Sequence, residues 1–156
     1  IVRSGVYDVA QVYYNALNTS AAEPVRGPWN TTNFQGLLQD CIEHDMGVMG
    51  IRIFAAGHLA TSKRHGREIP ITENSEDSAE EARAAALRTV WGSAYGEPAQ
   101  AALRFGMACD VLSTIVVGLG EIEHLKLVIE AAGLGPLPDD ALKVAAQVRT
   151  GPAFTD

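Results

Sequence analysis

The sequence predicts an α/β fold in which the strands lie parallel to one another. Three observations predict this class: three short runs rich in β-branched and aromatic residues, longer segments whose apolar residues recur at helical spacing, and the alternation of the two kinds along the chain. Strands that are joined through helices pair in parallel within one sheet. With 156 residues, the chain has the length of a single domain.

The first strand and the first helix are expected before residue 47. Residues 8–14 form a β-branched and aromatic run in which Gln11 is the polar interruption. A polar loop over residues 18–32 follows, because this segment contains prolines and a glycine. A helix should then end at Gly47, since apolar residues recur along one stripe at positions 34, 37, 38, 41 and 42.

The second strand is expected over residues 47–54, and a surface loop over residues 62–74 follows it. Ser78 and Glu81 match a capping box, in which the two side chains bind free N–H groups at a helix start, so a helix is predicted over residues 79–93. Its charged residues are interpreted as a solvated face; they are Glu80, Glu81 and Arg83.

The last third of the chain should contain two more helices around a third strand, and then a final helix. Pro98 suits the first turn of a helix that extends to about Cys109. Residues 113–117 are almost entirely apolar, which is typical of a strand buried on both faces. A tight connection at residues 118–120 leads into a helix with apolar residues on one side, at positions 122, 125, 128, 129 and 132. The final helix carries apolar residues at positions 141, 142, 145 and 148.

The composition excludes several classes of function. The chain has 12 Lys and Arg against 19 Asp and Glu, a formal net charge of -7, which argues against a nucleic-acid partner. No window approaches the roughly 18 consecutive apolar residues of a membrane helix, so we expect no membrane span and a soluble protein. Cys41 and Cys109 are too few for a disulfide scaffold, and a reduced, cytoplasmic setting is expected.

The residues from Gly118 to Gly120 are the strongest local signal for a ligand. They join a predicted strand to a helix start, where unpaired N–H groups and the helix dipole favour a phosphate and where glycine permits close approach. His124 lies one turn into that helix. The alternative interpretation is a simple tight turn, because glycine is common in turns.

Two polar residues within the predicted strands leave alternatives open. Gln11 either faces a ligand or bonds to a neighbouring loop. Arg52, between two isoleucines, requires a ligand anion, a carboxylate or access to solvent. The four histidines have no metal-ligand spacing, so we predict no metal site, and we find no catalytic triad or paired carboxylates.

Three motifs in one order resemble the C-terminal third to half of the aldo/keto reductases, closest to the bacterial branch that includes aldose dehydrogenases. They are Gln11-Val-Tyr-Tyr-Asn15, Gly47-Val-Met-Gly-Ile-Arg-Ile-Phe-Ala-Ala-Gly57, and Thr114-Ile-Val-Val-Gly118 followed by His124-Leu125. The resemblance implies an eight-stranded (β/α)8 TIM barrel that uses NADP or NAD to interconvert carbonyls and alcohols. Residues 1–156 would form the C-terminal part of one barrel domain and supply its strands 6 to 8.

The resemblance also implies where the cofactor binds. Gln11 matches a glutamine that contacts the nicotinamide, and Ile51 matches the position beneath the ring. The loop that touches the pyrophosphate is matched by Arg52, Phe54, Ala56 and Gly57. The segment that meets the adenosine phosphate is matched by Gly118, Leu119, Gly120 and His124. The lysine typical of NADP-specific members is absent at Gly118, and the choice between NAD and NADP therefore stays open.

The family's catalytic Asp, Tyr, Lys and His lie on the first four barrel strands, outside this chain. The resemblance therefore implies the cofactor-binding portion of an oxidoreductase that acts on aldehydes, ketones or aldoses and that requires the N-terminal portion of the barrel. The alternative is a truncated, non-catalytic binding or structural remnant of that fold. The sequence does not decide the exact substrate or the oligomeric state.

Overall fold

The computed structural model describes residues 1–25, 32–62 and 77–150. Strands and helices follow the predicted order: β1 (Val9–Tyr13), α1 (Leu37–Glu43), β2 (Gly47–Ile51), α2 (Asp77–Trp91), α3 (Pro98–Met107), β3 (Thr114–Ile115), α4 (Ile122–Leu134) and α5 (Asp139–Arg149). Two single-turn 3-10 helices are added, η1 (Val2–Ser4) before β1 and η2 (Ala55–Gly57) after β2. The predicted surface loop lies almost entirely outside the described residues, as does His65.

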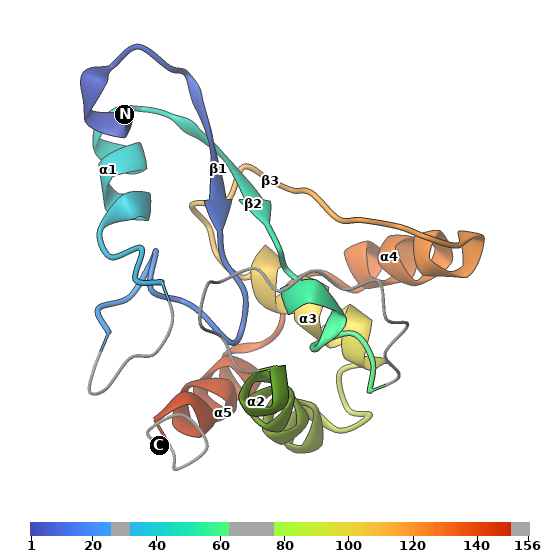
Figure 1. Ribbon diagram of the computed structural model, residues 1–156. Helices are drawn as coiled ribbons and strands as arrows, with labels where there is room; N and C mark the ends of the chain where they lie inside the picture. Colours follow the sequence, from blue (N-terminus) through green and yellow to red (C-terminus); the bar gives the residue numbers. More distant parts are fainter. Residues whose placement is uncertain (26–31, 63–76, 151–156) are drawn as a thin grey trace.

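The sheet confirms the predicted parallel α/β arrangement. Its strands lie side by side in the order β1-β2-β3 (Figure 1), and both strand pairs are parallel. Gln11 pairs with Met49, and Met49 pairs with Thr114, so the three strands share one register. The carboxyl ends of all three strands therefore lie at the same edge of the sheet.

The two faces of the sheet have different surroundings. Alternate residues of a strand point to opposite faces. Val12 and Val48 lie on the covered face and are fully buried. Val9 and Gln11 lie on the opposite face, where the Val9 side chain is 53% exposed. One face of the sheet is thus packed, and the other is open along β1.

Helices build the packed side. Leu38 and Cys41 of α1 join the core, as the helical stripe predicts. On α3, a Cβ atom at Gly106 would lie 2.8 Å from Ile53 Cδ1 and 3.1 Å from Ile115 Cδ1, so glycine lets this helix lie close to the segments that follow β2 and form β3. The helices α2 and α5 pack together, and so do α3 and α4. No helix within the described ranges is long and apolar enough to cross a membrane.

An aromatic stack joins the sheet to these helices. Tyr14, just after β1, stacks on Phe105 of α3 with ring centroids 5.7 Å apart. Trp91, the last residue of α2, approaches the same ring at 6.1 Å. Such pairs contribute about 0.5–1.5 kcal/mol beyond area burial. Phe105 therefore ties β1, α2 and α3 into one core.

Two predicted strands are shorter than expected. The prediction that β2 extends to residue 54 is wrong, because Arg52 has a φ of 63° and left-handed backbone ends an extended strand. The predicted third strand at residues 113–117 is reduced to Thr114 and Ile115. Its burial on both faces is also not found: Val116 is 46% exposed, because no described element covers it.

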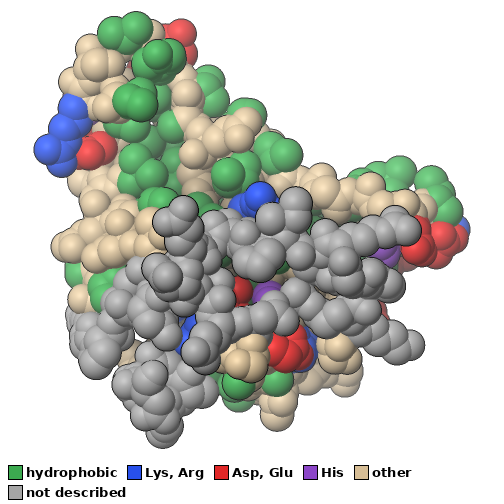
Figure 2. Space-filling view, viewed as in Figure 1, with side chains coloured by type: hydrophobic (Ala, Val, Ile, Leu, Met, Phe, Trp, Pro, Cys, Tyr) green, Lys and Arg blue, Asp and Glu red, His purple; other side chains and the backbone are tan. Residues whose placement is uncertain are grey.

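The apolar stripe predicted for α4 is only partly buried. Val128 packs against the buried Ala131 and Leu103, but Ile122 and Ile129 are 61% and 62% exposed. The helix contacts α3 through the neighbouring face, which turns the rest of the stripe to solvent. The hydrophobic side chains that Figure 2 shows at the surface include those over the segment that leads into β1 and those over α4.

Candidate functional site

A cavity of about 780 Å³ opens at the carboxyl-terminal edge of the sheet. It is formed where β1 and β2 end, by the turn after β2 and by the connection from β3 to α4. All but one of the residues predicted from the sequence line it: Gln11, Ile51, Arg52, Phe54, Ala56, Gly57, Gly118, Leu119 and His124. The lining also includes Ile53, Ala60, Thr61, Ala99, Val116, Val117, Leu127 and Val128.

The strands place an amide and an apolar side chain side by side in this cavity. Gln11 lies in the middle of β1 on the open face, and its side chain is exposed. Ile51 is the last residue of β2 and pairs with Tyr13, two residues beyond Gln11. Because Gln11 is exposed, burial does not force its amide to bond with a neighbouring loop.

The turn after β2 presents Arg52 to the same cavity. Its guanidinium is exposed, which resolves the sequence question of how a charge fits between two isoleucines. A hydrogen bond fixes its backbone: Asn15 Nδ2 donates to the carbonyl of Arg52 at 2.9 Å. Asn15 is fully buried, and the sequence analysis gave it no role.

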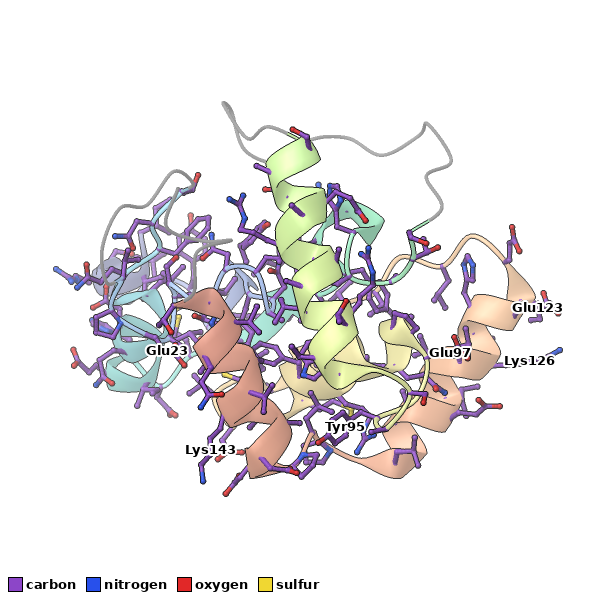
Figure 3. The ribbon with its side chains drawn as sticks, turned by 90° about the horizontal axis from the view of Figure 1, so that it is seen from below. Glu23, Tyr95, Glu97, Glu123, Lys126 and Lys143 are labelled. Carbon is purple, nitrogen blue, oxygen red and sulfur yellow. The ribbon has the colours of Figure 1, made fainter. Side chains whose placement is uncertain are left out.

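The connection from β3 to α4 forms the opposite wall. Gly118 and Leu119 line the cavity, whereas Gly120 lies just outside the lining and donates its N–H to His124 Nδ1 at 3.4 Å. No side chain caps the N-terminus of α4, so its first N–H groups are open to an anion. Figure 3 shows Glu123 and Lys126 at the outer end of α4, where they pair with each other at 3.4 Å.

The cavity residues fit a dinucleotide. A cationic guanidinium, a histidine and an uncapped helix start provide contacts for phosphates, and the glycines allow close approach. The apolar side chains of Ile51, Phe54 and Val128 suit the flat faces of aromatic rings. Few polar groups placed among apolar walls are typical of cofactor pockets.

A charged cluster lies behind the turn and was missed by the sequence analysis. The side chain of His58 is 2% exposed, and its Nδ1 lies 2.9 Å from Glu81 Oε2 of α2. Glu80 approaches His58 Nε2 at 3.7 Å, and Arg83 is buried as well. The predicted solvated face of α2 is therefore wrong, because this face packs against the turn after β2.

The predicted capping box is also wrong. Ser78 lies within α2, and the Glu81 carboxylate bonds with His58 and Arg88. Burial raises the pKa of the Glu81 carboxyl, but the hydrogen bonds from these two side chains outweigh burial and hold the pKa below its ordinary value. Glu81 and Arg88 are seven residues apart, a spacing that places two side chains on one helix face. In the sequence, this spacing was the one indication that Glu81 and Arg88 pair with each other.

Among the described residues, Cys41 and His44 lie outside the cavity. Cys41 is buried, and burial raises the pKa of its thiol. His44 is exposed and lies 2.9 Å from the carbonyl of Asp40, consistent with the predicted solvated position. Among the described residues, no group of three His, Cys, Asp or Glu side chains could hold a metal ion.

The fold and the cavity define an α/β protein with a candidate ligand site at the carboxyl ends of parallel strands, the place where barrel enzymes build their sites. The model of the aldo/keto reductase family matches residues 6–149. The chain therefore belongs to the aldo/keto reductase family, whose members generally bind NADP(H) or NAD(H). No curated protein sequence matches the chain.

Solved structures of this family share the fold. The chain is similar to the holo form of the aldo-keto reductase AKR11C1 from Bacillus halodurans, with a TM-score of 0.67, 16% identity, and coverage of 94% of this chain and 44% of that one. It is also similar to the glycerol dehydrogenase AKR11B4 from Gluconobacter oxydans, with a TM-score of 0.64, 12% identity, and coverage of 91% and 42%. The chain spans less than half the length of these structures.

Proposed function

We propose that residues 1–156 form the C-terminal, cofactor-binding part of an NAD(P)-dependent oxidoreductase of the aldose dehydrogenase-like branch. In this proposal β1, β2 and β3 are strands 6, 7 and 8 of a (β/α)8 barrel. The single observation that carries it is the convergence of Gln11, Arg52, Gly118 and His124 on one cavity at the carboxyl ends of the strands. These residues come from three separate segments of the chain.

Each wall of the cavity has a distinct role in this proposal. Gln11 binds the carboxamide of the nicotinamide, and Ile51 supports its ring. Arg52 and the N-terminus of α4, with Gly118 and His124, hold the phosphates. When bound, the cofactor supplies the hydride. The protein residues position it and exclude water.

The open edges of the sheet support a second part of the proposal, the need for an N-terminal portion. Val9 and Val116, at the two edges of the sheet, are 53% and 46% exposed. Five further strands would cover these edges and supply the residue that protonates the carbonyl. The substrate would be a small aldehyde, ketone or aldose.

Cofactor binding to the full-length protein tests this function. Titration with NADPH and NADH, followed by protein fluorescence, should show saturable binding by the wild type. Arg52→Ala should weaken that binding by about 1–3 kcal/mol, the range for losing a hydrogen bond to a charged group. The guanidinium is exposed in the cavity, so its removal should leave the fold intact.

Arg3→Ala is the matched control, because this arginine is also exposed but pairs with Asp40, away from the cavity. Its dissociation constant should equal that of the wild type. An unchanged dissociation constant for Arg52→Ala would show that Arg52 does not bind the cofactor. Absence of binding by the wild type would reject the cofactor function itself.

A further inference from the structure

The turn after β2 has an unusual backbone. Arg52, Ala55, Ala56 and Gly57 all have φ values between 47° and 96°, in the left-handed region. This region costs a non-glycine residue about 1 kcal/mol or more, so such turns persist only where surrounding contacts hold them. The turn therefore needs anchors.

One anchor is at the start of the turn, and a second is at its end. At the start, the buried Asn15 amide binds the carbonyl of Arg52. At the end, Arg88 donates to the carbonyl of His58, and the His58 ring contacts the Glu81 carboxylate. Figure 1 and Figure 3 show α2 beside this turn. In the sequence, residues 58–76 separate η2 from α2, and residues 63–76 of this stretch lie outside the described part.

The anchored segment is also a wall of the cavity. Phe54, Ala56, Gly57 and Thr61 line the cavity, whereas His58 between them is buried against α2. A change in the position of His58 would therefore move residues that face the ligand. The cluster lies behind the wall and does not itself line the cavity.

The Glu81 carboxylate is the centre of the second anchor, because it contacts both His58 and Arg88. Its two oxygens contact two different partners, His58 through Oε2 and Arg88 through Oε1. His58 and Arg88 are largely buried, so removal of the Glu81 carboxylate, which is itself 33% exposed, leaves two buried side chains without their partner. His58 belongs to the turn, so the turn loses one of its contacts with α2 when the Glu81 carboxylate is removed.

We propose that Glu81 is a positioning residue that fixes the 54–61 wall of the cavity through His58 and Arg88. It sets the affinity of the site without touching the ligand. That the ligand is a nicotinamide cofactor rests on the proposed function above. The inference that Glu81 positions the wall depends only on the contacts between α2 and the turn, and not on the identity of the ligand.

The test compares Glu81→Gln with the wild type in the full-length protein. Hydrogen exchange without cofactor should become faster in residues 54–61 and stay unchanged in residues 9–13. The dissociation constant for NADPH should rise about tenfold or more, since small displacements of positioning groups have effects of this size. The kcat at saturating cofactor should stay within about twofold, because Glu81 touches no reacting group.

Asp40→Asn is the matched control, because it also removes a carboxylate that pairs with an arginine, on α1 and outside the cavity lining. It should leave both the exchange of residues 54–61 and the dissociation constant unchanged. Arg88→Lys, which keeps the charge but loses the forked contact, should reproduce the local effect and serves if Glu81→Gln does not fold.

Uniformly faster exchange across the protein would overturn the proposal, because it would show a structural role only. If the wild type binds NADPH and Glu81→Gln binds it with the same dissociation constant, the proposal is overturned as well. If the wild type binds no cofactor, the proposed function fails, and the exchange of residues 54–61 alone then decides whether Glu81 positions the wall.

Discussion

Asn15 shows how one buried side chain can organise the edge of a site. Its Oδ1 accepts the N–H groups of Leu17 and Asn18 at 2.9 and 3.0 Å, while its Nδ2 donates to the carbonyl of Arg52. The side chain thus closes the turn after β1 and holds the turn after β2. Because all of these groups are buried or partly buried, water cannot easily replace the amide.

We expect Asn15→Ala to lower the free energy of unfolding of the full-length protein by about 2–4 kcal/mol, since several buried polar groups lose their partner. Denaturant unfolding measures the change. Asn33→Ala is the control: its Oδ1 accepts the N–H of Gln35, but the residue is exposed, and the loss should be about 0.5 kcal/mol or less. Equal effects of the two substitutions would contradict the role of Asn15.

At the scale of elements, α2 connects stability to pH through Glu81. Hydrogen bonds hold the pKa of this carboxyl below its ordinary value of 4.5. A carboxyl with a lower pKa in the folded state stabilises the fold above its unfolded pKa, and this contribution disappears as the pH falls through the folded pKa. The charges of Glu80 and Arg88 belong to the same cluster, since Glu80 contacts His58 and Arg88 contacts Glu81.

Glu81→Gln should therefore destabilise the full-length protein at pH 7, and its effect should shrink as the pH falls through the folded-state pKa of Glu81, below which the wild-type carboxyl is protonated. Urea unfolding at several pH values, with Asp40→Asn as the comparison, measures this difference. A Glu81→Gln effect that stays constant as the pH falls, down to the acid unfolding of the protein, would show that the charge of Glu81 does not stabilise the fold.

The order and direction of the strands could be predicted, because they depend on local periodicity and on a general rule for crossovers. Where β2 ends could not, since it depends on the left-handed Arg52 and on an asparagine 37 residues away in sequence. The charged face of α2 was misread for a similar reason. Its partner, His58, comes from a distant turn, and helical periodicity says nothing about which charged face is packed.

The candidate site could be predicted to a larger extent than the packing around it. Motif resemblance carried residues such as Gln11 and Gly118 into one proposed site, and the structure places them in one cavity. Resemblance could not reveal the cluster around Glu81, because those residues belong to no motif that was recognised. The wall behind a site is determined by tertiary packing, which one sequence does not show.

At the scale of the whole molecule, apolar residues are exposed at both edges of the sheet. Tyr7 and Val9 are exposed at one edge of the sheet, and Val116 and Ile122 are exposed near the other. Exposed apolar patches mark interaction surfaces or ligand-binding grooves. The chain also spans 44% of the holo AKR11C1 chain that it matches. Both observations suit a barrel that is completed by an N-terminal portion.

We therefore expect the isolated 156-residue chain to show no measurable carbonyl reductase activity with NADPH or NADH, because the resemblance to the family implies that the catalytic Asp, Tyr, Lys and His lie outside these residues. A spectrophotometric assay of the purified chain at a range of aldehydes and aldoses measures this. Co-expression with an N-terminal portion should restore turnover, and the native mass should then correspond to the completed barrel. Turnover by the 156-residue chain alone would mean that the proton donor lies within these residues. Failure of both forms to turn over, with a native mass equal to that of this chain, would favour the non-catalytic remnant.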